Sequence, residues 1–243
     1  MAGLARAETP PDRGVAPVDP IEAIIPGDLR TLPFQNPQVV FLVRVDATGK
    51  LVEHMALTAT HHGLIPAAAK ALQAAAFTPA VVAGQPVPAN GQVAVTLFDP
   101  QQRAYLRGNR AQLPFGGSAM DAAQSHLYRA DPTHHEYHRS KASELDAPVE
   151  VKATKIMLYA DDAGKAAVGR CVVEYWVDAD GSVRFPRVVS SDNEAVSLSA
   201  LLTLQQTRFA PPTHDGGVPT YVQVRQAMEF NIEPAAPKTP AGA

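Results

Sequence analysis

The feature that most constrains the fold is a repeat within the chain. The stretch from Cys171 to Val183 reads as a strand, a tight turn and the start of a second strand, and the stretch from Val39 to Leu51 has the same pattern. Residues of the two stretches align 132 positions apart, and later pairs keep this offset: Val45 with Val177, Gly49 with Gly181, Phe77 with Phe209, Pro79 with Pro211, and Gly84 with Gly216. A match of this length without gaps predicts two copies of one small domain.

The first strand of each copy alternates between apolar and more polar residues, which is typical of a strand with one buried face. The residues expected to point inward are Val39, Phe41, Val43 and Val45 in the first copy, and Cys171, Val173, Tyr175 and Val177 in the second. A D-x-x-G turn follows, in which Asp can accept a backbone bond two residues on and Gly supplies a positive φ. The returning strands are predicted at 51–57 and 183–189, and Pro186 places the second at an edge or a bulge.

A helix and a last strand complete each copy. The helices are predicted at 66–76 and after an N-cap at Asp192 or Asn193, and an F-x-P motif ends each of them. The last strands are predicted at 92–98 and 221–230. We therefore expect an α+β fold of two tandem two-layer domains in the order β-β-α-β. Each domain would have a three-stranded antiparallel sheet, with strand order 2-1-3, covered on one face by one helix.

These patterns give a division of the whole chain. We expect a flexible N-terminus at 1–17, a first domain at 18–100, a connector with short helices at 101–147, a second domain at 148–233, and a disordered tail at 234–243. Ile21, Ile24 and Ile25 are interpreted as a lead-in to the first domain, with one helical turn.

Composition and motifs exclude several classes of function. The net charge of -3 and pI of about 6.2 argue against nucleic acid or an anionic membrane as a partner. The sequence has no Walker loop, dinucleotide fingerprint, H-E-x-x-H or G-x-S-x-G motif, so we expect no enzyme activity and no cofactor. Cys171 is the only cysteine and can form no internal disulfide. Its inward position predicts a buried, unreactive thiol.

The N-terminus suggests export. Ala5-Arg6-Ala7 has the small-x-small form of a secretory cleavage site and precedes a proline-rich stretch. We interpret it as the end of a signal peptide whose apolar part the sequence lacks, and we expect a periplasmic or secreted protein. An ordinary unstructured N-terminus is the alternative interpretation.

The pattern resembles the TonB C-terminal domain family. The best match runs from Val173 through the V-D-A-D-G turn to Ser191, and continues with Arg208-Phe-Ala-Pro211, whereas the first copy matches more loosely. The resemblance implies a cell-envelope location and the binding of an extended peptide by strand addition at a sheet edge. An energy transducer of this family would have an N-terminal membrane helix, a Pro/Lys-rich spacer and one such domain. The sequence shows a different organisation, which favours a binding module or scaffold.

The resemblance also implies where the partner binds. By the geometry of the family, the open edges would be 93–98 and 222–230. The predicted partner-binding residues are Val93, Val95, Leu97, Val222 and Val224. Trp176 is added because an indole on the face away from the helix must be covered by the other domain, the connector, a second chain or a ligand.

Other candidate sites were weighed against simpler interpretations. The connector holds His126, His134, His135 and His138, and His134 and His138 would share a helix face at a metal-ligand spacing. No cysteine or well-placed carboxylate completes such a site, so solvated histidines are the favoured interpretation. Asp46, Asp178 and Asp180 are explained by turn chemistry and not by catalysis.

The sequence therefore predicts a non-enzymatic envelope protein that binds a protein or peptide partner through its sheet edges. Two alternatives stay open: a homo-oligomeric scaffold in which edges pair between chains, and a metal-binding accessory protein that uses the connector histidines.

Overall fold

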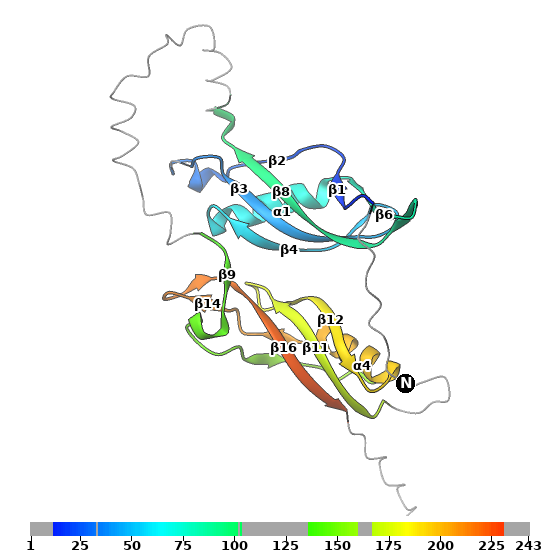
Figure 1. Ribbon diagram of the computed structural model, residues 1–243. Coiled ribbons are helices and arrows are strands. Elements are labelled where there is room, and N and C mark those ends of the chain that lie inside the picture. The colour runs from blue at the N-terminus through cyan, green and yellow to red at the C-terminus, as the bar shows by residue number, and fades with distance from the viewer. Residues whose placement is uncertain (1–11, 33, 102, 104–135, 160–166, 231–243) are drawn as a thin grey trace, which may run out of the picture. The chain divides into compact units, whose positions relative to one another are not determined.

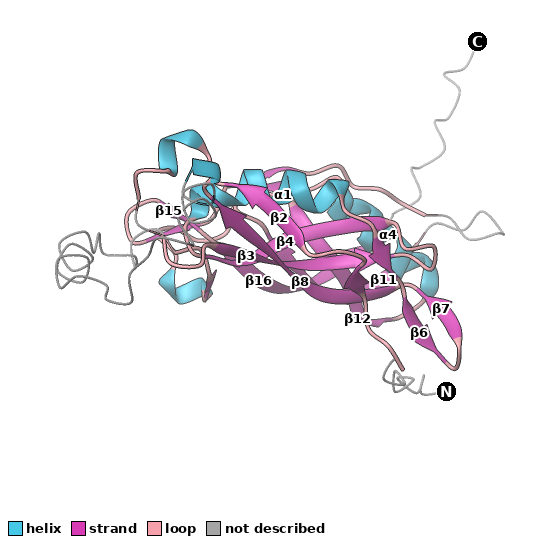
Figure 2. Cartoon of the chain, turned by 90° about the horizontal axis from the view of Figure 1, so that it is seen from above, coloured by secondary structure: helices cyan, strands magenta, loops and turns pink. Residues whose placement is uncertain are grey.

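The computed structural model describes residues 12–32, 34–101, 103, 136–159 and 167–230. Strands are the commonest regular element in this part of the chain, and the α-helices whose bounds are described are α1 (Ile65–Ala74) and α4 (Glu194–Gln205) (Figure 2). The predicted α+β class is confirmed. The chain divides into two compact units, residues 1–139 and 140–243, which we call unit 1 and unit 2 (Figure 1). The helix expected near residues 118–129 lies outside the described residues.

Within its described residues, unit 1 has one main sheet, the helix α1 and several short elements. Besides α1, these are β1 (Ala16–Pro17), β2 (Ile21–Ile24), η1 (Gly27–Leu29), β3 (Gln38–Val45), β4 (Leu51–Ala59), η2 (His62–Leu64), β5 (Phe77–Thr78), β6 (Ala80–Val82), β7 (Gln85–Val87) and β8 (Ala89–Phe98). The predicted inward residues of β3 are all buried, as alternation required.

The main sheet of unit 1 has four strands in the order β2-β8-β3-β4, where three were expected. The extra strand is β2, which we had interpreted as a lead-in with a helical turn. It pairs in parallel with β8, from Ile21 opposite Val95 to Ile24 opposite Phe98. Ile21 and Ala23 are buried, because the period-two pattern of a strand turns both toward α1, which packs against β2. The expectation of an open edge at 93–98 is therefore wrong.

The described part of the N-terminus is paired with unit 1. We expected residues 1–17 to be flexible, but the amide of Asp12 donates to the carbonyl of Val81 at 2.8 Å. Ala16 pairs with Thr78 in the short β1–β5 ladder. Residues 1–11, which include the proposed cleavage site, lie outside the described residues.

Unit 2 also contains one main sheet and one α-helix. Besides α4, its elements are β9 (Arg139–Ser140, at the boundary), η4 (Ala142–Glu144), β10 (Val151–Ala153), β11 (Gly169–Val177), β12 (Val183–Ser191), β13 (Arg208–Phe209), β14 (Thr213–His214), β15 (Val218–Pro219) and β16 (Tyr221–Phe230). The main sheet has the order β12-β11-β16-β9, again with one strand more than expected.

Strand β12 is both an edge strand and a bulged one, as Pro186 required. Its pairing with β11 shifts between Glu174 opposite Arg187 and Trp176 opposite Arg184, so Phe185 and Pro186 together face Tyr175. The backbone of Phe185 has φ 48°, which is unusual for a non-glycine residue, and it lies within the bulge. Its side chain is buried. A bulge of this kind makes the outer edge of β12 a poor template for another strand.

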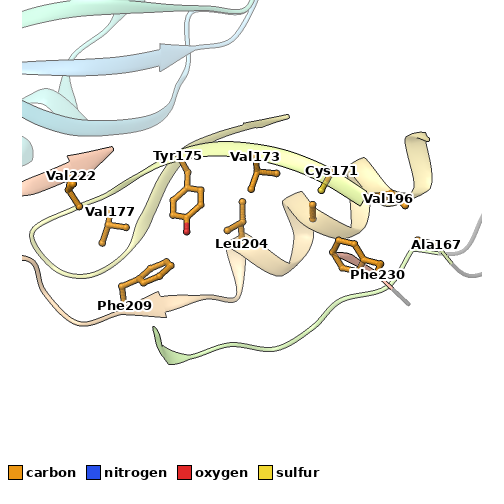
Figure 3. Close-up of a cluster of buried hydrophobic side chains, with 11 residues drawn as sticks. Ala167, Cys171, Val173, Tyr175, Val177, Val196, Leu204, Phe209, Val222 and Phe230 are labelled. Atoms are coloured by element: carbon orange, nitrogen blue, oxygen red, sulfur yellow. The ribbon is translucent and has the colours of Figure 1, made fainter. Parts of the chain in front are cut away.

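The core of unit 2 lies between β11 and α4 (Figure 3). The predicted inward residues of β11 are all buried, and Val196, Ala200 and Leu204 of α4 pack against them. The helix begins as expected at Asn193, whose side chain accepts a hydrogen bond from the amide of Val196 at 2.9 Å. Burial raises the pKa of Tyr175 to about 12, and its hydroxyl donates to Oε1 of Gln226 at 2.8 Å.

In both units the turn glycine lies against the backbone of the F-x-P motif. A Cβ on Gly49 would lie 2.4 Å from the carbonyl oxygen of Phe77, and one on Gly181 would lie 2.1 Å from that of Phe209. Both glycines have positive φ, +86° and +78°. In unit 2 the amide of Phe209 also donates to the carbonyl of Gly181 at 2.8 Å. This contact gives a physical reason for the fixed spacing of the two motifs in the sequence.

Candidate functional site

The candidate site lies along the outer edge of β16. On one side this strand pairs with β11, from Val222 opposite Val177 to Phe230 opposite Gly169. On the other side it pairs with β9, which has 2 residues against the 10 of β16. Most of this edge therefore has no strand partner within the described part of the chain. Its outward amides and carbonyls are available to another strand.

The corresponding edge of β8 in unit 1 is filled by β2. The side chains of Val93, Val95 and Leu97 are buried at 3%, 0% and 2% exposure. They pack in the core of unit 1 and not at its surface, because alternation on β8 turns them inward. Within unit 1, these three residues form part of the hydrophobic core.

Residues 142–149, which we call the wall segment, lie beside the open part of β16. After β9 the chain turns away from the sheet through η4 and runs past β14 (Figure 1). Leu145 forms a bridge with His214, and the amide of Asp146 donates to the carbonyl of Thr213 at 2.9 Å. Leu145 and Val149 pack against the core cluster of unit 2. The segment thus has both backbone and side-chain anchors.

The carboxylate of Asp146 provides the strongest polar anchor of the wall segment. Its two oxygens accept hydrogen bonds from the amides of Gly216 and Gly217 at 3.0 and 2.9 Å. The bond from the Gly216 amide is the largest cause that holds the pKa of Asp146 below its ordinary value. The carboxylate is therefore ionised near neutral pH and is turned toward the β14–β15 hairpin.

A pocket of about 440 Å³ lies between the wall segment and β16, and we call it the edge groove. Apolar groups form most of its lining, together with Asp146, Gln223 and Arg225. The full lining consists of Ala142, Leu145, Asp146, Ala147, Pro148, Val149, Val222, Gln223, Val224 and Arg225. A strand that added to β16 would lie along this groove.

The outward face of the sheet beside the groove carries a charged cluster. Arg187 donates through Nε to Oε2 of Glu174 at 2.7 Å and forms a very short second contact with the same oxygen. Gln223 donates to the other oxygen of Glu174 at 2.8 Å. Arg225 lies opposite Glu174 in the β11–β16 ladder, is exposed, and forms no ion pair with any described residue. The carboxylate of Glu174 is thus already paired, whereas the guanidinium of Arg225 has no ion-pair partner among the described residues.

The predicted residues Val222, Val224 and Trp176 lie close to this groove in different ways. Val222 is 1% exposed, so it offers its backbone to the edge and its side chain to the core. Val224 packs partly against the core and lines the groove. Trp176 lies on the outward face opposite Gln223, and its ring centre is 5.5 Å from that of Tyr221.

The turn aspartates and Cys171 occupy positions in which they stabilise turns or pack in the core. Asp46 accepts from the amides of Thr48 and Lys50 at 2.8 and 3.0 Å, which is the turn chemistry expected for it. In unit 2 the amide of Ser182 donates to Oδ1 of Asp180 at 2.8 Å, which is the corresponding bond between residues two apart. Burial raises the pKa of Cys171, which favours the neutral thiol.

The metal interpretation can be examined for one connector histidine. His138 is described, and His126, His134 and His135 lie outside the described residues. Within the described ranges, no group of three or more His, Cys, Asp or Glu side chains could hold a metal ion.

Sequence reasoning did not find the wall segment or Arg225. The wall segment has no periodic pattern, and its place beside β16 depends on contacts with the distant β14–β15 hairpin and with the core of unit 2. Arg225 could have been found from the strand register, because it lies directly opposite Glu174 in the β11–β16 pairing.

The fold places unit 2 in the class of small α+β domains in which a helix packs on a sheet of a few strands. The family model of the Gram-negative bacterial TonB protein C-terminal matches residues 159–232, which include β11, β12, α4 and β16. Unit 2 therefore contains a TonB C-terminal domain, as the resemblance predicted. The match does not extend to unit 1 or to the wall segment. No curated protein matches the chain closely enough to count as a relative.

The family supports a TonB-like protein-interaction module of the cell envelope. Within the described residues, no helix has the length and hydropathy required to cross a lipid bilayer.

Proposed function

We propose that this chain is a non-enzymatic periplasmic protein that binds an extended segment of a partner protein by strand addition to β16. The observation that carries the proposal is the outer edge of β16, most of which has no strand partner within the described residues. A strand in this position would extend the sheet and would satisfy amides and carbonyls that otherwise bond only to water. The match of unit 2 to the TonB family supports this proposal.

The two units are proposed to be tandem copies of one domain with different tasks. Unit 1 would keep the fold but use β2 to close the edge that unit 2 leaves open. Trp176 would border the added strand on the outward face, next to Gln223. The chain would then bind one peptide and not two.

The test is to find a peptide and then to locate its hydrogen bonds. The full chain is panned against a random 12-residue display library, and selected peptides are measured by calorimetry and by hydrogen-exchange footprinting. We expect protection within residues 222–226 and a stoichiometry of one. Single N-methyl groups should then abolish binding at alternate peptide positions only, because a strand at an edge uses every second amide. A footprint elsewhere, or equal effects at all positions, would contradict strand addition.

A second outcome of the same experiment concerns the homo-oligomeric alternative. Two β16 edges could pair between chains, since an open edge is a template for any strand. Light scattering over a range of protein concentrations would then give a dimer that the selected peptide dissociates. A monomer at all concentrations removes this alternative and leaves strand addition of a foreign segment.

A further inference from the structure

The edge groove differs on its two faces, and the difference bears on which peptides can enter. On the side of α4, the groove is lined by Leu145 and Val149, which pack against the core, and by Val224. On the outward side it is lined by Gln223 and Arg225. An added strand would turn successive side chains alternately to these two sides, because its period is two.

The side of the edge groove that faces α4 suits a large apolar side chain of the added strand. The groove holds about 440 Å³, which is room for an aromatic or long aliphatic group beside the peptide backbone. Its only acidic lining residue is Asp146, and both of its oxygens already accept backbone bonds from Gly216 and Gly217. An apolar side chain in this position would bury surface at about 25 cal/mol per Å² and leave no polar group unpaired.

The outward side of the edge groove suits an acidic side chain of the added strand. Arg225 is exposed and has no ion pair within the described residues, while its neighbour Glu174 is already bonded to Arg187 and Gln223. A carboxylate on the added strand next to Arg225 would meet a free guanidinium and no free acid on β11. Charge complementarity of this kind sets specificity and the rate of association.

We propose that the edge groove selects an extended segment in which a large apolar residue stands next to an acidic one. The apolar side chain would fill the space between the wall segment and Val224, and the acid would pair with Arg225. The wall segment lies outside the residues that match the family, so this selectivity would be a property of this chain. The inference rests on the proposed strand addition at β16.

Three labelled peptides test the inference with the full chain. Each has the frame Thr-Val-Thr-X-Z-Val-Thr, where the X-Z pair is Phe-Glu, Phe-Lys or Ala-Glu, and binding is followed by fluorescence anisotropy. We expect the Phe-Glu peptide to bind at least about tenfold more tightly than either of the others. Arg225→Glu should weaken the Phe-Glu peptide about tenfold and strengthen the Phe-Lys peptide. Lys155→Glu, which makes the same charge change on the exposed stretch after β10, should alter neither.

The wall is tested separately. Leu145→Ala should enlarge the groove and reduce the preference for Phe over Ala, and the fluorescence of Trp176 shows whether unit 2 stays folded. Equal binding of the three peptides, or no exchange of preference in Arg225→Glu, would overturn the selectivity and leave strand addition standing. Binding of none of the three would overturn the inference together with the proposed function at β16.

Discussion

The third strands of the two units differ mainly in what lies beside them. In unit 1, β3 pairs with one side of β8, and β2 pairs with the other side from Val95 to Phe98. In unit 2, β16 is paired by β11, and on its other side by the two residues of β9. Both strands have 10 residues and both follow an α-helix and an F-x-P motif. The difference therefore comes from the segments that precede the domain, and not from the domain itself.

A short flanking segment can therefore decide whether the edge of a sheet is paired or left open. The 4 residues of β2 are held by the packing of Ile21 and Ala23 under α1. Arg103 also lies over the ring of Phe98 and forms a two-pronged ion pair with Glu22, at 2.7 and 3.0 Å. The wall segment of unit 2 has its own anchors, but they hold it next to the edge of β16 without pairing with most of it.

The largest expected effect comes from breaking the closed edge. Ile21→Asp places a charge where the native side chain is 7% exposed, and should destabilise unit 1 by about 3 kcal/mol or more. Ile24→Asp is the matched control, because Ile24 lies on the same strand at 49% exposure and should cost less than about 1 kcal/mol. Chemical unfolding is followed by circular dichroism for the whole chain.

The only tryptophan, Trp176, reports on unit 2 in the same experiment. Its fluorescence transition should not move in Ile21→Asp. Equal stability of the two aspartate variants would show that β2 is not part of the core.

The next effect tests the feature that the units share. Gly181→Ala would bring a Cβ within 2.1 Å of a backbone oxygen at positive φ, and should destabilise unit 2 by about 2–3 kcal/mol. Gly49→Ala should do the same to unit 1. Gly84→Ala and Gly216→Ala are controls, since these glycines have positive φ but open space around them, and should cost about 1 kcal/mol. If all four variants lose the same stability, the contact with the F-x-P backbone has no energetic role.

A smaller effect should appear in local opening. Along β16 from 223 to 226, alternate amides should exchange with solvent about a hundredfold faster than their neighbours, because they face the unpaired edge. Along β8 from 95 to 98 no such alternation is expected, since β2 covers this edge. Hydrogen exchange followed by NMR measures both strands in one sample. Uniform protection of β16 would mean that its edge is covered in solution.

The smallest effect concerns pH. Because backbone hydrogen bonds lower the pKa of Asp146, the stabilisation of the wall segment is complete above the ordinary value of 3.8 and is lost as pH falls through the lowered pKa. The amide signals of Gly216 and Gly217 should therefore shift with a midpoint below 3.8. Asp146→Asn should abolish the shift, whereas Asp46→Asn in unit 1 should leave it unchanged. A midpoint above 3.8 would contradict the hydrogen-bonded geometry.

Much of the fold could be predicted because local patterns and the repeat agree. Alternation in β3 and β11 gave the buried faces, Asn193 was one of two expected N-caps, and Pro186 indicated an edge or a bulge. These features depend on neighbours within a few residues. The TonB resemblance was also carried by such local motifs, and the family match confirms it for residues 159–232.

What could not be predicted depends on contacts between distant segments. Nothing in Ile21-Glu-Ala-Ile24 distinguishes a strand from a helical turn until β8 and α1 are in place beside it. The wall segment likewise depends on distant contacts, such as those of Asp146 with Gly216 and Gly217, 70 and 71 residues further on. Half of the candidate site, the backbone of β16, was therefore foreseen, and the groove beside it was not.

The bulge at Phe185 and Pro186 has a consequence for how such a chain could assemble. A row of paired strands grows only when each added unit has two open edges, one that pairs with the existing row and one that accepts the next strand. In unit 2 the bulge disrupts the outer edge of β12, whereas most of the outer edge of β16 has no strand partner within the described residues. If β16 accepts a strand as proposed, the bulged edge of β12 would hinder the addition of a further one, so unit 2 would end a row of strands and not extend it.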